Sequence, residues 1–241
     1  MPVSGGGPTT IDQLETAIGR TLDYSLHYEY LAETFPNAAE MADAASGRTP
    51  MISLHCGVAA DIGSGTLDAQ IDARATAYAA FGKPVLLRYC WEMNLQMRGV
   101  TPTDFVAAWK RMHDRTIARG ANNVLWFFCP SHGTGLAYYP GDAYVDYAGW
   151  DAYDDRGAGL AATMGPPYSA YTSINKPFIV GETGAMASLN QATYLDGSSR
   201  ALLTGQFPKI VGITYFDASG AVDWSLSPAG LAAFKAFALS K

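Results

Sequence analysis

Seven short apolar segments recur along the chain at a regular spacing, and this spacing limits the folds that the sequence can adopt. Each is rich in β-branched and aromatic residues, as expected of strands buried on both faces of a parallel sheet. We predict strands at residues 21–28, 50–56, 84–90, 122–129, 144–150, 177–182 and 210–216. Their starts lie about 31 residues apart on average, the step of a (β/α)8 barrel of roughly 250 residues.

The segments between these strands carry apolar residues three or four positions apart, as amphipathic helices that cover a sheet do. The clearest sets are Leu67, Ile71, Ala75 and Tyr78, and Phe105, Ala108, Trp109 and Met112. Thr10 and Gln13 form a capping box at the start of the first predicted helix. Alternating strands and helices predict one α/β domain over residues 1–241, a TIM-like (β/α)8 barrel.

An eightfold barrel requires one more strand, and the spacing places it before the helix that begins near Thr10. Only residues 1–9 precede that helix, and they are rich in Pro and Gly around Val3. Such a segment does not make a strand by itself. We therefore predict that the position of the first strand is vacant, distorted or filled by other backbone. An open edge there would favour oligomerisation.

Composition and motifs exclude several classes of function. The net charge is −6 with Lys and Arg scattered, so the sequence predicts no binding to nucleic acid or to an anionic membrane. No apolar run is long enough for a membrane span, and residues 1–8 lack the pattern of a signal peptide. Neither a phosphate-binding loop nor a calcium-loop motif is present, and we predict no metal or organic cofactor.

Three cysteines, Cys56, Cys90 and Cys129, lie inside or at the end of predicted strands. The count is odd and no C-x-x-C pair occurs. These positions favour buried apolar thiols over a disulfide framework or a zinc site.

Two glutamates end predicted strands, where an unpaired carboxylate is costly to bury. Glu92 closes Pro84-Val-Leu-Leu-Arg-Tyr-Cys-Trp-Glu-Met-Asn94, and Glu182 lies in Lys176-Pro-Phe-Ile-Val-Gly-Glu-Thr-Gly184. If the seven strands are the second to eighth of a barrel, the two carboxylates meet at its C-terminal face, where such barrels carry their active sites. Paired carboxylates there indicate acid/base and nucleophilic chemistry on a glycosidic bond.

Side-chain alternation along a strand extends this prediction below the two glutamates. It puts Arg88 and Cys90 on the inward side with Glu92, and Phe178 and Val180 inward with Glu182. Arg88 would then lie beneath the cleft. A salt bridge between Arg88 and Glu92 is the alternative, purely structural interpretation.

These segments resemble glycoside hydrolase family 26, whose (β/α)8 barrel carries an acid/base at the end of strand four and a nucleophile at the end of strand seven. The resemblance covers nearly the whole chain. It rests on the two segments above, on Gly120-Ala-Asn-Asn-Val-Leu-Trp126, on Tyr139-Pro-Gly-Asp142 and on Val145-Asp-Tyr-Ala-Gly-Trp-Asp-Ala-Tyr153. It implies that Glu92 is the acid/base, that Glu182 is the nucleophile, that Tyr153 hydrogen-bonds the nucleophile, and that the enzyme is extracellular.

Two features depart from the family pattern. Trp91 stands where the family has histidine before the acid/base, although an indole face can stack on a sugar ring. The first strand, whose following loop contributes to sugar binding in the family, has no obvious counterpart. A non-catalytic carbohydrate-binding relative is therefore an alternative interpretation.

Further residues at or near strand ends are candidates for substrate binding. They are His55, Arg88, Trp91, Asn94, Trp126, Tyr153, Tyr215 and Trp224. Aromatic residues on strands belong as often to the core, which is the alternative for Trp126. His132 could line the cleft, and we interpret Asp217 as a loop cap.

The function predicted from the sequence is hydrolysis of internal β-linkages of a polysaccharide or oligosaccharide with retention of configuration. The resemblance favours β-1,4-mannan, with mixed-linked β-1,3-1,4-glucan or β-1,3-xylan as alternatives. Retention requires the two carboxyl groups to lie about 5 to 5.5 Å apart. A phosphate-binding metabolic barrel ranks last, because Gly181-Glu-Thr-Gly184 carries a carboxylate where phosphate would bind.

Overall fold

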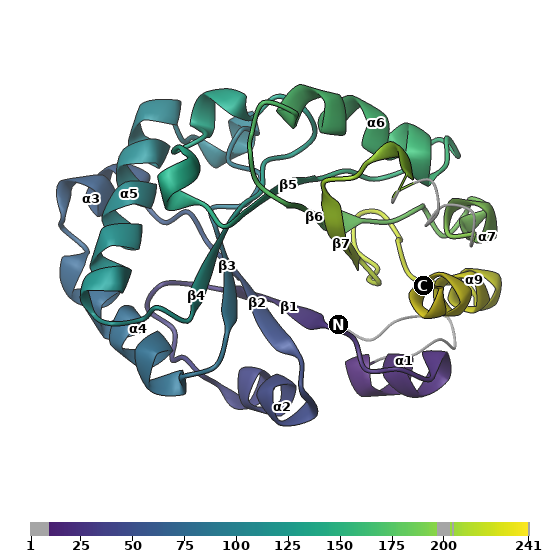
Figure 1. Ribbon diagram of the computed structural model, residues 1–241, viewed down its shortest axis with the longest axis horizontal. Coiled ribbons are helices and arrows are strands. Elements are labelled where there is room, and N and C mark those ends of the chain that lie inside the picture. The colour runs from purple at the N-terminus through teal and green to yellow at the C-terminus, as the bar shows by residue number, and fades with distance from the viewer. Residues whose placement is uncertain (1–9, 197–202, 204, 241) are drawn as a thin grey trace.

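A computed structural model describes residues 10–196, 203 and 205–240 of the chain. In this part, seven parallel strands form one sheet in sequence order, curled like a barrel wall with helices on its outer side (Figure 1). The strands are β1 (Tyr24–Glu29), β2 (Thr49–Leu54), β3 (Val85–Tyr89), β4 (Val124–Phe128), β5 (Tyr147–Asp151), β6 (Phe178–Thr183) and β7 (Ile210–Tyr215). The predicted TIM-like α/β fold is confirmed, and each strand begins within three residues of its predicted start.

Several of the helices that cover the sheet begin at residues whose side chains cap them. Thr10 accepts a hydrogen bond from the backbone N–H of Gln13 at the first helix, and Thr101 caps the longest helix, which has Pro102 in its first turn. None of the described helices is both long and apolar enough to cross a bilayer. The described helices are α1 (Ile11–Ile18), α2 (Ala38–Ser46), α3 (Ala59–Ser64), α4 (Asp68–Phe81), α5 (Pro102–Ala118), α6 (Leu160–Tyr171), α7 (Gln191–Tyr194) and α9 (Pro228–Leu239). Three 3-10 turns accompany them: η1 (Gln96–Arg98), η2 (Leu136–Tyr138) and η3 (Asp142–Tyr144).

Alternation along the strands divides the core into two clusters. The larger cluster joins strand residues to helix residues and includes Trp109 of α5 and Trp126 of β4, whose ring centroids lie 5.4 Å apart. The smaller contains strand-borne residues that face the barrel interior: Met51, Leu86, Phe127, Cys129 and Ile179. Trp126 therefore faces the helices, and its predicted role in substrate binding is wrong.

A register shift reverses the predicted facing of β6. Trp150 pairs with Val180, whereas the next residue, Asp151, pairs with Glu182. Such a bulge moves the following side chains to the opposite face. Phe178 and Val180 consequently pack against the helices, and the prediction that they share the inward face of Glu182 is wrong.

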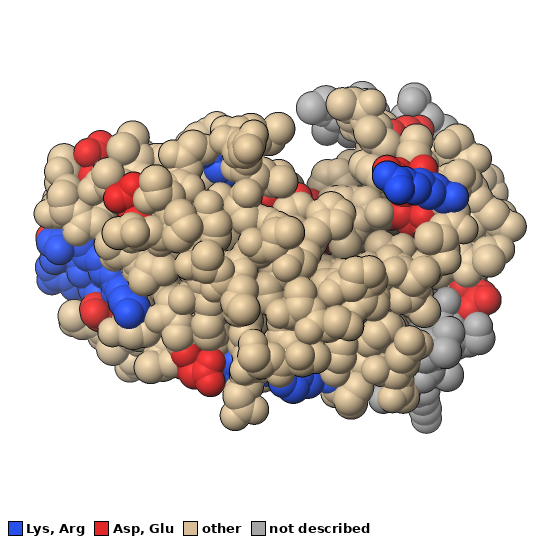
Figure 2. All heavy atoms as spheres, turned by 90° about the horizontal axis from the view of Figure 1, so that it is seen from above, with Lys and Arg blue, Asp and Glu red and all other residues tan. Residues whose placement is uncertain are grey.

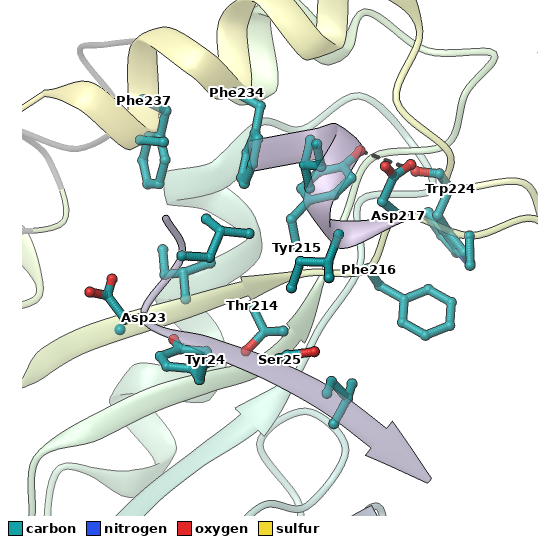
Figure 3. Close-up of a pocket in the computed structure, with 18 of the residues that line it drawn as sticks. Asp23, Tyr24, Ser25, Thr214, Tyr215, Phe216, Asp217, Trp224, Phe234 and Phe237 are labelled. Carbon is teal, nitrogen blue, oxygen red and sulfur yellow. Dashed lines mark hydrogen bonds between the residues drawn. The ribbon is translucent and has the colours of Figure 1, made fainter. Parts of the chain in front are cut away.

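The two ends of the sheet, β1 and β7, face each other across a groove of about 1020 Å³ (Figure 3). No strand ladder joins them in the described part of the chain. The Tyr24 side chain of β1 reaches across to β7, since a Cβ added to Gly212 would lie 2.7 Å from the Tyr24 hydroxyl. Phe234 and Phe237 of α9 also line the groove. The prediction for the first barrel strand falls on residues 1–9, which lie outside the described residues.

A strand supplied to this groove should raise the melting temperature, because within the described residues no ladder pairs the N–H and C=O groups on the facing edges of β1 and β7. We would fuse an alternating β-branched segment before Thr9 and expect a gain of several degrees, since 1 kcal/mol corresponds to about 2–4 °C at this size. Thermal unfolding would measure it. The control carries proline at alternate positions and cannot pair. Equal melting temperatures for the two fusions would contradict the prediction, and light scattering would show whether the unfused chain associates through its edges.

Candidate active site

The carboxylate of Glu182 is fixed by three hydrogen-bond donors at the C-terminal end of β6. Arg88 Nη2 donates to its Oε1 at 2.5 Å and the Tyr28 hydroxyl donates to the same oxygen at 2.6 Å. The Tyr153 hydroxyl donates to Oε2 at 2.6 Å, so the contact expected of Tyr153 is present. Glu182 is 5% exposed, so a small part of it remains open to solvent while its orientation is set by the protein.

Arg88 is the central cation beneath this carboxylate. Its guanidinium is wholly buried and contacts both oxygens of Asp151, at 3.3 and 3.2 Å, as well as Glu182. The side chain contacts the Glu182 carboxylate and has no exposed surface, which argues against its predicted role in substrate binding. The alternative pairing of Arg88 with Glu92 is replaced by these two ion pairs.

A glycine in β6 makes room for this buried cluster. A Cβ added to Gly181 would lie 2.6 Å from both Arg88 Nη1 and Asp151 Oδ1, and would also meet the Cys129 sulfur. The Cys129 thiol donates a hydrogen bond of 3.1 Å to Asp151 Oδ1. The absence of a side chain at position 181 therefore lets the ion-pair cluster pack directly against the strand.

Glu92 lies in the turn that follows β3, and its environment differs from that of Glu182. Its backbone has a φ of 53°, in the left-handed region, and its N–H donates to the carbonyl of Cys129 at 2.9 Å. Burial raises the pKa of Glu92 above its usual range, the charge of Glu182 raises it further, and the Arg98 guanidinium opposes this. A carboxyl group with a raised pKa keeps its proton to higher pH, as a general acid requires.

Cys56 and Cys90 form a disulfide, so the prediction of three free buried thiols is wrong for this pair. The two residues follow the neighbouring parallel strands β2 and β3, whose C-terminal ends lie together. Cys90 has a φ of 50°, which ends the alternation predicted for it. Cys129 is buried and free, as predicted. The disulfide joins the segment after His55 to the turn that carries Glu92.

Trp91 is packed among three side chains, Tyr28, His55 and Arg98. The centroids of Tyr28 and His55 each lie 4.9 Å from it, and Arg98 Cζ lies 4.4 Å from its centroid. At 8% exposure little of the indole is open to solvent, and its predicted stacking on a sugar stays a prediction. Tyr30 is 57% exposed and stacks flat on His55 at 4.0 Å, so this pair offers the open aromatic surface instead.

Trp224 and Tyr215, two further residues predicted to bind substrate, differ in the side chains on which they pack. Trp224 packs on Tyr153 with a centroid distance of 4.5 Å and thus stays a candidate for sugar binding. The Tyr215 ring packs on Phe234 of α9 and lines the groove of Figure 3, which is also lined by Trp224 and by Tyr28, a hydrogen-bond donor to Glu182. Neither Glu92 nor Glu182 lines that groove.

Several polar residues brace the loops around the site. Asn94 donates to the carbonyl of Ser131 and accepts from its N–H, both at 2.8 Å, which joins the turn of Glu92 to the loop after β4. The exposed His132 side chain contacts the Ser131 hydroxyl at 2.9 Å. Asp217 accepts a hydrogen bond from Leu226 N–H, so its interpretation as a loop cap is confirmed.

Sequence reasoning missed Tyr28 and Asp151, although both lie at the C-terminal ends of predicted strands. Tyr28 was the last residue of the first predicted strand, and Asp151 follows directly on the fifth. The rule that selected the two glutamates, a polar side chain at the C-terminal end of a parallel strand, would have found them.

The family model described as Glycosyl hydrolase family 26 matches residues 66–200, more than half of the chain. The chain belongs to glycosyl hydrolase family 26. Endoglucanase H of Acetivibrio thermocellus is 31% identical over 201 residues, which cover 73% of this chain and 22% of that protein. The mannan endo-1,4-beta-mannosidase of Bacillus subtilis is 28% identical over 127 residues, 47% of this chain and 34% of that protein.

The fold also agrees with this family. The structure of the Bacillus subtilis mannanase BCman superposes with a TM-score of 0.68 at 21% identity, over 93% of this chain and 79% of that chain. The present chain spans about a fifth to a third of the length of the two sequence relatives above.

Replacing Gly181 by alanine should lower both stability and activity, because the added methyl group displaces Arg88 and Asp151. Overpacking of this kind costs about 1–3 kcal/mol. Urea unfolding and turnover would measure the two effects. Gly165→Ala is the matched control, since its Cβ would meet nothing within 4 Å. A Gly181→Ala protein with unchanged turnover would contradict the prediction.

Proposed function

We propose that this member of family 26 hydrolyses internal β-linkages of a polysaccharide with retention of configuration, β-1,4-mannan first. The observation that carries the proposal is the contrast between the two glutamates. Glu182 is held rigidly by Arg88, Tyr28 and Tyr153, as suits a nucleophile. Glu92 has a raised pKa and few partners, as suits an acid that later serves as a base.

In the first step, a Glu182 oxygen forms a bond to the anomeric carbon while the bond from that carbon to the leaving oxygen breaks. Glu92 gives its proton to the leaving oxygen. In the second step, Glu92 takes a proton from water, whose oxygen bonds to the anomeric carbon and displaces Glu182. Two inversions at the same carbon retain its configuration.

The named relatives support a β-linked glycan but point to two sugars. The mannosidase of Bacillus subtilis favours mannan, whereas Endoglucanase H matches a larger part of this chain and favours a glucan. Mixed-linked β-1,3-1,4-glucan is therefore the second candidate, and β-1,3-xylan follows. A neutral substrate fits the surface, because the Lys and Arg side chains in the view of Figure 2 lie in separate small groups.

We further propose that residues 1–241 form one catalytic domain that acts outside the cell. The Cys56–Cys90 disulfide supports this location, because disulfides persist in oxidising surroundings. The alternative of a non-catalytic sugar-binding protein is less favoured, because both glutamates and the contact from Tyr153 are kept.

A panel of mannan, barley-type glucan and xylan tests the substrate. We expect new reducing ends with mannan, and the initial anomer seen by proton NMR should have the β configuration. Binding of one of these glycans without any release of reducing ends would instead identify a sugar-binding protein.

Substitution of the two glutamates should have unequal effects on an activated aryl glycoside. Glu182→Ala should abolish turnover, because no other group forms the glycosyl-enzyme. Glu92→Ala should keep formation of the glycosyl-enzyme, because a good leaving group needs no proton. Burst kinetics would measure this difference, and external azide should restore turnover of the second variant with a glycosyl azide of retained configuration, whereas any azide product of the first variant should be inverted. Equal residual activity of the two variants would refute the assignment.

The two carboxyl groups should lie about 5 to 5.5 Å apart, as a retaining mechanism requires. A crystal structure of the Glu92→Gln protein with a bound oligosaccharide would measure the distance. A separation near 9 Å with intact strands would indicate inversion instead.

A further inference from the structure

Arg98 reaches back from η1 over the turn that carries Glu92. Its Cζ lies 4.4 Å from the centroid of the Trp91 ring, and its Nη2 lies 3.7 Å from Glu92 Oε2. Its Nε is buried and has no hydrogen-bond partner within the described residues. The guanidinium is therefore held by the indole face rather than by hydrogen bonds to the backbone.

The indole that supports Arg98 is itself fixed. Tyr28 and His55 pack against Trp91, and Cys90, directly before it, is bonded to Cys56. Trp91 thus provides a rigid support beside the acid/base. A cation resting on such a support is placed with little loss of side-chain freedom when a substrate binds.

The distance between Arg98 and Glu92 suits a group that must change its protonation state. At 3.7 Å the contact is too long for a hydrogen bond, so Glu92 remains free to protonate a leaving oxygen. The positive charge is nevertheless near enough to favour the carboxylate that the second step needs. Arg88 is less able to do this, because Asp151 and Glu182 already surround it.

We propose that Arg98, held on the Trp91 indole, is a positioning residue that orients the Glu92 carboxyl and promotes its return to the ionised form between the two steps. This inference rests on the proposed role of Glu92 as acid/base. The charged and titratable groups around Glu92 come from four elements and the segment after β2. They are Glu182 of β6, Asp151 of β5, Arg88 of β3, Arg98 of η1 and, across Trp91, His55.

His55 does not supply a competing positive charge at neutral pH. Burial and the neighbouring Arg98 both lower the pKa of His55. Removal of Arg98 would therefore leave Glu92 facing two carboxylates with only Arg88 to balance them.

Arg98→Met tests the inference, because methionine keeps an apolar stem over Trp91 and removes the charge. Arg98→Lys is the matched control that restores a charge, and Arg98→Gln is a second neutral variant. The titration of Glu92 would be followed by 13C NMR of its side-chain carboxyl, assigned with Glu92→Gln. We expect an upward shift of the midpoint in both neutral variants and a midpoint near that of the unmodified protein with lysine.

The kinetic counterpart is the pH profile of kcat/KM on the cleaved glycan. Its alkaline limb, which reports loss of the Glu92 proton, should move to higher pH in Arg98→Met. Added salt should move the same limb upward in the unmodified protein and not in Arg98→Met. A folded Arg98→Met protein with an unchanged Glu92 midpoint would overturn the inference. If no glycan is cleaved, the proposed function fails, whereas the NMR titration still decides the role of Arg98.

Discussion

The contact of Arg88 with Asp151 and Glu182 is the interaction on which the site depends. Arg88 and Asp151 have no exposed surface and Glu182 is 5% exposed, and a buried ion pair that loses one partner costs about 3–5 kcal/mol. Much of the neighbouring sequence accommodates this contact. The bulge between β5 and β6 turns Glu182 inward, and Gly181 leaves the space that the guanidinium occupies. Glu182, the proposed nucleophile, is thus held by buried core residues.

The same residue type plays two parts because its surroundings differ. Glu182 lies on a strand and is bound by three donors, so its geometry is set before any substrate arrives. Glu92 lies on a turn with left-handed backbone and has a single ionic neighbour beyond the buried cluster, Arg98. One carboxylate is rigid and the other can exchange a proton, which is the division of labour that two-step glycoside hydrolysis needs.

Much of this arrangement was predictable from the sequence, because periodicity and strand ends follow from local residue patterns. The seven strands and the helices between them, and the strand-end positions of Glu92 and Glu182, follow from such patterns. The side of the sheet on which Phe178 and Val180 lie could not be predicted in this way. A register shift depends on how two strands pair and is not visible in the sequence of either strand. The Cys56–Cys90 disulfide was not predicted for a related reason, because it depends on which strand ends become neighbours in the fold. The low exposure of Trp91 could not be predicted either, because it depends on packing by Tyr28, His55 and Arg98 from three other segments.

The disulfide beside the acid/base has a practical consequence for making the protein. Synthesis in a reducing cytosol would deliver chains in which Cys56 and Cys90 are thiols, and the turn of Glu92 would lose its covalent link to the segment after β2. Two preparations with the same mass to within two hydrogens would then differ in how firmly the acid/base is held. Secretion into the periplasm, or oxidative refolding followed by a thiol titration, would give a uniform sample for kinetic work.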